Sequence, residues 1–367
     1  MIQTHVLNAT LLDGLRGEAA YQLISFVDGL VAPSFIFASG FVFAVALRRK
    51  LPEYLSFGPA LRKQVGKLLF VLALGYSLHL PVFSLRRLVE GVPPDAWTTF
   101  WAVDVLQCIA VSLLLVLVIL QVVRTGRRLL TVLPWVAAGI AFLTPVVWSV
   151  NPAWLLPQPV AAYFNAGYGS QFPLFPWSVF LLSGIVAGGV FEAARDRQPG
   201  REGDDPIRSS VRRFAVTGAA LVAGSFVIQP VLTALYPPHG DGRASPSFLL
   251  LRLGLVFLLL SLCYLYERRA GVGKRSVVTL VGRESLLVYT AHLQVIYASI
   301  GGLSFHTWVN RSFGYPAVIA ATLVLLGLMI LLAFWWDRVR RGDRRRMRRV
   351  QWLALAVFLV AFIVSPG

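Results

Sequence analysis

Four ionisable side chains lie within or beside long apolar segments, where a charge is costly and therefore suggests a function. They are His5, Asp28, Asp104 and His292. A neutral imidazole near its usual pKa can serve as a general base at pH 7 or as a nucleophile. Because Asp28 and Asp104 each precede an apolar segment, they are interpreted either as helix caps or as catalytic carboxylates. We predict that all four residues are catalytic.

Several polar residues accompany these four at helical spacing. Asn8 follows His5 by about one turn, Gln107 lies three residues after Asp104, and Tyr289 lies three residues before His292. The candidates for substrate binding on this basis are Asn8, Gln107, Arg252 and Tyr289. Because they come from separate apolar segments yet share one depth, the sequence predicts a polar pocket that opens on one side of a membrane.

The other histidines and the cysteines are interpreted as structural residues. His79 is predicted to be a hydrogen-bonded packing residue, and His306 falls in a loop without a predicted role. Cys108 and Cys263 lie in apolar runs and lack the spacing of metal ligands, so neither a disulfide framework nor a metal site is expected. The sequence also lacks a His-Glu-x-x-His motif, a glycine-rich phosphate loop and a Gly-x-Ser-x-Gly elbow.

The elements that must position these residues are membrane-spanning helices. Hydrophobic residues make up 57% of the 367 residues and charged residues only 14%, an excess too large for one water-soluble core. We predict an all-α, polytopic integral membrane helix bundle, a single domain over residues 1–367, with a truncated first helix at 1–12. The ten complete helices are predicted at 30–47, 67–84, 105–123, 129–148, 176–191, 214–235, 248–266, 285–301, 317–336 and 352–364.

The basic residues predict the orientation of these helices. Of the 34 Lys and Arg residues, 28 fall in every second loop: 48–67, 124–128, 192–213, 267–283 and 337–349. Positive charge favours the cytoplasmic side, so we place these loops in the cytoplasm and the predicted pocket on the other side. The net charge of +17 is explained by this pattern, and nucleic-acid binding is not expected.

Four motifs, in order along the chain, resemble a family of membrane acyltransferases. Residues 29–41 read Gly-Leu-Val-Ala-Pro-Ser-Phe-Ile-Phe-Ala-Ser-Gly-Phe, and residues 103–109 read Val-Asp-Val-Leu-Gln-Cys-Ile. A Pro-Trp pair ends at Trp177, and Gly-Arg-Glu-Ser-Leu-Leu-Val-Tyr at 282–289 precedes His292. Together they are similar to bacterial proteins like the catalytic domain of heparan-α-glucosaminide N-acetyltransferase, within the wider membrane acyltransferase superfamily.

The resemblance implies transfer of an acetyl or acyl group from cytosolic acyl-CoA to an extracytoplasmic sugar or glycan. It assigns the catalytic histidine to His5, with Asp28 or Asp104 orienting the ring, and adds Trp177 to the substrate-binding candidates. The family usually begins with Asp-x-x-Arg-Gly and a full apolar helix, and both are missing before His5. The similar stretch at 13–17 comes too late to be that motif, so we expect the chain to begin within the family's first helix. The loop 9–27, where the heparan enzyme carries its histidine, contains none.

The resemblance also implies the partners. Acetyl-CoA or another acyl-CoA is expected as co-substrate rather than as a tightly bound cofactor, with Arg283 as a candidate for its phosphates. Membrane lipid, a carbohydrate or glycolipid acceptor and a second copy of the chain are further expected partners, in a bacterial inner membrane. A secondary transporter or flippase, and a catalytically inactive family member, are the alternatives.

Overall fold

The computed structural model describes residues 1–197, 205–236, 242–271, 276–298, 304–342 and 344–365. Within these ranges the chain is helical without strands, apart from one isolated parallel bridge between Leu11 and Phe313. The predicted all-α class is therefore confirmed.

Seven helical stretches in the described ranges are long and apolar enough to cross a membrane. They contain seven of the ten predicted helices: Ala19–Leu55, Val105–Val123, Gly126–Ser149, Leu174–Arg195, Pro206–Leu235, Pro246–Ala270 and Tyr315–Arg341. This result confirms a polytopic membrane protein.

The other three predicted helices form, but differ from the predicted spans. The helix α4 (Pro59–Ser77) begins with a charged turn, and α14 (Ser285–Tyr297) has 13 residues. The end of the predicted segment 285–301 lies outside the described residues. The helix α17 (Arg344–Val364) begins with arginines and becomes apolar only afterwards. Ten membrane crossings therefore remain a prediction.

The chain divides into two compact units, which are described separately. Unit 1 comprises Met1–Gly29, Leu80–Trp97 and Gly271–Gly367, and unit 2 comprises Leu30–His79 and Thr98–Ala270. The short helix α6 (Pro94–Trp101) has residues in both units.

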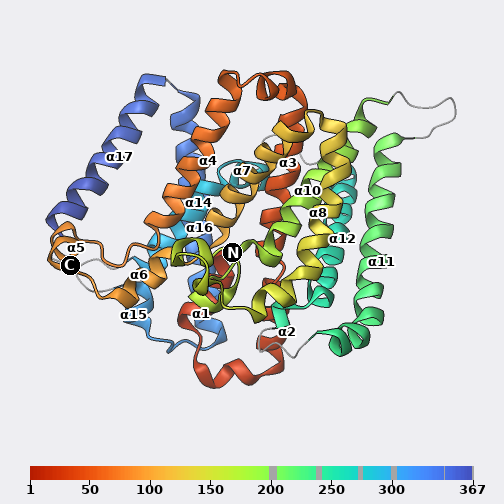
Figure 1. The fold of residues 1–367 in the computed structure, drawn as a ribbon. Helices are drawn as coiled ribbons and strands as arrows, with labels where there is room; N and C mark the ends of the chain where they lie inside the picture. Colours follow the sequence, from red (N-terminus) through yellow and green to blue (C-terminus); the bar gives the residue numbers. More distant parts are fainter. Residues whose placement is uncertain (198–204, 237–241, 272–275, 299–303, 343, 366–367) are drawn as a thin grey trace. The chain divides into compact units, whose positions relative to one another are not determined.

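In unit 2, two helix pairs pack through glycines. Its helices are α3 (Val31–Leu55), α4, α7 (Val105–Val123), α8 (Gly126–Ser149), α9 (Gln158–Ala161), α10 (Leu174–Arg195), α11 (Pro206–Leu235) and α12 (Pro246–Ala270). The helix α3 packs along α10, and α11 along α12 (Figure 1). A Cβ added to Gly184 would lie 2.0 Å from the Phe37 carbonyl oxygen, and one added to Gly254 would lie 2.7 Å from the Gly218 carbonyl oxygen. Glycine thus lets these backbones approach closely.

In unit 1, the N-terminal helix α1 (Ile2–Thr10) packs against α14 and α16 (Tyr315–Arg341). Its Val6 and Leu7 are buried in a core that includes Ile296 and Met329. The remaining helices of the unit are α2 (Ala19–Asp28), α5 (Leu85–Glu90), α13 (Val277–Arg283), α15 (Phe305–Val309) and α17, with a 3-10 turn η1 (Asp13–Gly17). The apolar face of α1 thereby fixes the position of His5 on its first turns.

Candidate functional site

Two predicted catalytic histidines meet in unit 1. The rings of His5 on α1 and His292 on α14 lie with their centroids 5.2 Å apart. The Tyr289 ring lies edge-on to His292 at 5.7 Å. The structure thus brings together residues from opposite ends of the sequence, as expected for a site built from separate helices.

The backbone holds His292 in one tautomer. Its Nδ1 lies 2.7 Å from the Val288 carbonyl oxygen, which can only accept, so Nδ1 carries the proton in the neutral ring. The ring is 1% exposed, and its Nε2 has no hydrogen-bond partner within the described ranges. A buried nitrogen lone pair without a donor is costly, so His292 can accept a proton or a hydrogen bond.

Two aromatic residues beside this pair were not predicted. Tyr297 stands edge-on to His5, with ring centroids 5.9 Å apart, and its hydroxyl donates to the His5 carbonyl oxygen at 3.4 Å. His306 lies 5.9 Å from Tyr297 and contacts the Ala9 carbonyl oxygen through Nδ1 at 3.1 Å. Tyr297 follows Tyr289 by about two helical turns, a spacing that could have indicated it. His306 was predicted in a loop, but it lies in the short helix α15, and no spacing in the sequence indicated its role.

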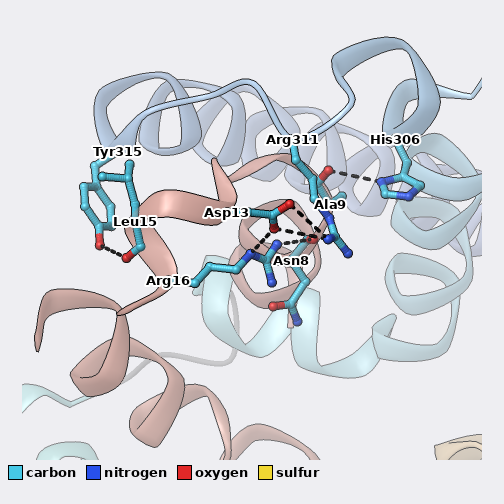
Figure 2. A network of polar contacts seen from close by, with 8 residues as sticks. All are labelled: Asn8, Ala9, Asp13, Leu15, Arg16, His306, Arg311 and Tyr315. Atoms are coloured by element: carbon cyan, nitrogen blue, oxygen red, sulfur yellow. Dashed lines mark hydrogen bonds and ion pairs between the residues drawn. The ribbon is translucent and has the colours of Figure 1, made fainter. Parts of the chain in front are cut away.

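An exposed polar network holds the segment that follows α1 (Figure 2). Asp13 pairs with Arg16 at 3.0 Å and with Arg311 at 3.1 Å. Arg16 also donates to the Asn8 carbonyl oxygen at 3.0 Å, so Asn8 joins this network through its backbone. The stretch 13–17, which the sequence set aside as a misplaced motif, therefore ties the end of α1 to the loop before α16.

The two predicted carboxylates differ in their helix positions. Asp28 is the last residue of α2 and does not begin a helix, so its interpretation as an N-cap is wrong. It is 9% exposed and accepts a hydrogen bond from Gln3 at 3.5 Å. Asp104 does cap α7, since its Oδ1 accepts from the Val105 amide at 2.7 Å. Asp104 belongs to unit 2 and His5 to unit 1, so its predicted role in orienting His5 remains a prediction.

Asp104 and Gln107 form a polar cluster with the end of α4 in unit 2. The Nε2 of His79 lies 3.6 Å from the Oδ2 of Asp104. Gln107 is fully buried against Gly75, and neither of its amide atoms has a hydrogen-bond partner within the described ranges. Beside it, Tyr76 and Tyr163 share a 2.8 Å hydrogen bond between hydroxyls. Burial is the main cause that raises the pKa of Tyr163, so this phenol stays neutral at physiological pH.

Trp177 and Arg252 are linked through one ring. Trp177, in the first turn of α10, lies edge-on to Phe248 at 6.4 Å, and the Arg252 guanidinium sits 5.4 Å from the same ring centroid. Both predicted residues are buried. The Phe248 ring thus packs against Trp177 on its edge and makes a cation–π contact with Arg252.

Arg283 lies in a network of opposite charges. It pairs with Asp337 at 3.6 Å, while Arg340 pairs with Glu284 at 2.7 Å and Arg341 with Asp337 at 2.8 Å. Asp337 and Glu284 are buried, so this network stabilises the junction of α13, α14 and α16. A phosphate would compete with Asp337 for Arg283, so the role of Arg283 in binding coenzyme A stays a prediction.

A comparison with protein-family models finds a match over the N-terminal part of the chain. The model described as "heparan-alpha-glucosaminide N-acetyltransferase, catalytic" matches residues 1–222, more than half of the chain. The curated proteins and the solved structures give no match. The matched region includes His5, Asp28, Asp104 and Trp177, and it ends before His292.

Proposed function

Because the chain belongs to the heparan-α-glucosaminide N-acetyltransferase catalytic family, we propose that it transfers an acetyl or other acyl group from acyl-CoA to a sugar or glycan. The family supports a membrane transferase, and the geometry that favours catalysis is the contact between His5 and His292. The family name suggests the amine of a glucosaminide as acceptor, and a sugar hydroxyl is the alternative.

The reaction needs a base and a leaving group. In direct transfer, the acceptor nitrogen or oxygen attacks the thioester carbonyl, the new C–N or C–O bond forms, and the C–S bond breaks. The acceptor proton passes to His5, and the CoA thiolate leaves and is protonated. In the alternative route, a His5 ring nitrogen attacks the thioester carbonyl, an N–C bond forms, and the C–S bond breaks as the CoA thiolate leaves. The acceptor then attacks the acyl-imidazole, the bond between the acyl group and His5 breaks, and the released imidazole takes the acceptor proton.

His292 supports either route from its buried position. Its fixed Nδ1–H leaves Nε2 as an acceptor near His5, so it can orient the His5 ring or share its proton. The Tyr289 hydroxyl is a candidate donor to the oxyanion.

The proposed topology places donor and acceptor on opposite sides of the membrane. The 28 basic residues of alternate loops support a cytoplasmic location for those loops. Acyl-CoA then approaches from the cytosol, and the acceptor lies outside a bacterial inner membrane.

Membranes that contain this chain test the proposal directly. We expect radiolabelled acetyl-CoA to label glucosamine or another amino sugar in a panel, and we expect His5→Ala to abolish the label while the protein keeps its melting temperature. Full activity in His5→Ala would remove His5 from the mechanism. Gradient-dependent sugar uptake without labelling would identify a transporter instead.

A further inference from the structure

The C-terminal end of α4 contacts the N-terminal end of α7 in unit 2 through two pairs of residues. Gly75 lies in the last turn of α4 and His79 just after its end, while Asp104 caps the start of α7 and Gln107 lies in its first turn. Gln107 packs on Gly75, where a Cβ would lie 2.8 Å from its side-chain amide, and His79 faces Asp104. These four residues are called the α4–α7 cluster.

Both ring nitrogens of His79 face oxygen atoms. Nδ1 lies 3.2 Å from the Ala102 carbonyl oxygen, and Nε2 lies 3.6 Å from Oδ2 of Asp104. A carbonyl and a carboxylate only accept, so the two groups that face the ring are both acceptors. The contact with Ala102 agrees with the predicted hydrogen-bonded packing role of His79, and the contact with Asp104 adds a second partner for its ring.

Asp104 keeps acceptor capacity for a ligand. Its Oδ1 binds the Val105 amide and its Oδ2 faces His79, while a carboxylate offers about four lone-pair sites. Its side chain is 24% exposed, so a ligand can reach it. A carboxylate disfavours the phosphates of coenzyme A and favours hydroxyl or ammonium donors.

Gln107 adds an unsatisfied donor and acceptor one turn further along α7. A fully buried carboxamide without hydrogen bonds is costly, so a polar ligand that paired with it would stabilise it. The rings of Tyr76, Phe100 and Trp101 contact one another nearby, with centroids 4.7 to 5.7 Å apart. Aromatic rings with a few convergent polar groups are typical of small-molecule sites.

We infer that the α4–α7 cluster binds the sugar acceptor: Asp104 accepts from its amino or hydroxyl group, Gln107 pairs with a neighbouring polar group, and His79 positions Asp104. The inference rests on the proposed function for the identity of the ligand. It assigns Asp104 to acceptor binding in place of the predicted orientation of a catalytic ring.

Asp104→Asn tests this role without removing the helix cap, because Asn caps as well as Asp. We measure initial rates against glucosamine at saturating acetyl-CoA, and against acetyl-CoA at saturating glucosamine. We expect the KM for glucosamine to rise about tenfold to a hundredfold, as for loss of a hydrogen bond to a charged group. The KM for acetyl-CoA should stay within about twofold, since the carboxylate of the cluster disfavours the phosphates of coenzyme A. His79→Gln should raise the same KM less, because Gln can still donate to Ala102.

Asp205→Asn is the matched control. Asp205 also caps a helix of unit 2, through the Ile207 amide, and pairs with the exposed Arg268. We expect this variant to keep both KM values. An unchanged glucosamine KM in Asp104→Asn, or an equal rise in both KM values, would overturn the inference.

Glucosamine binding to purified protein separates this inference from the proposed function. We expect glucosamine to raise the melting temperature of the wild type but not of Asp104→Asn. If the wild type binds glucosamine in this way without acetyl transfer, the binding site stands and the proposed reaction fails. If the wild type transfers acetyl and Asp104→Asn is stabilised by glucosamine like the wild type, the reaction stands and the site is wrong.

Discussion

At the scale of single residues, the Nε2 of His292, which has no hydrogen-bond partner among the described residues, should contribute to turnover. His292→Phe keeps a ring of similar size in the buried position and removes both nitrogens. We expect kcat to fall about a hundredfold, the lower end of what acid–base catalysis contributes, with little change in the KM for acetyl-CoA. The measurement is the steady-state rate of purified protein, compared at equal melting temperature. If the stable variant keeps the wild-type kcat, His292 has only a packing role.

The sequence indicated each candidate site residue by itself but could not show which of them lie in contact. The cost of an ionisable group in an apolar run pointed to His5 and His292, and their contact depends on α1 packing against α14. The partner of Asp104 was missed, because nothing in the spacing shows that α4 ends opposite the start of α7. Asp28 was placed at a helix start because apolar patterns leave boundaries uncertain by a few residues, and here α2 ends at Asp28 itself.

At the scale of helices, the α3–α10 contact should be sensitive to one methyl group. In Gly184→Ala, the new Cβ would lie 2.0 Å from the Phe37 carbonyl oxygen, so the two backbones must separate. We expect a loss of about 1–3 kcal/mol, as for other overpacked sites, seen as a lower melting temperature in detergent. Gly139→Ala in α8 is the control, because no atom lies within 4 Å of its added Cβ. Equal melting temperatures would show that the helices adjust without cost.

Apolar length predicted most of the helices well. The segment 105–123 agrees with α7 in both boundaries, because Asp104 caps its start and Arg124 ends it in a left-handed conformation. The predicted helix boundaries were least accurate where the first turns of a helix contain charged residues, as in α4 and α17. A window of hydropathy cannot show which helices pack together, so the glycine contacts were visible only in the structure.

At the scale of the whole molecule, the alternation of basic loops predicts which side of the membrane each loop faces. The helix α8 gives a simple test, because its 24 residues span about 36 Å and its two ends differ in charge. In a Cys263→Ser background, which leaves only the buried Cys108, we introduce Arg127→Cys before α8 or Leu155→Cys after it. Leu155 is 86% exposed, so a cysteine there should react with a membrane-impermeant maleimide in intact cells. A cysteine at 127 should react only after permeabilisation.

The reverse labelling pattern would invert the topology and place the acceptor side of the proposed reaction in the cytoplasm. Labelling of both cysteines in intact cells would show that α8 does not cross the membrane.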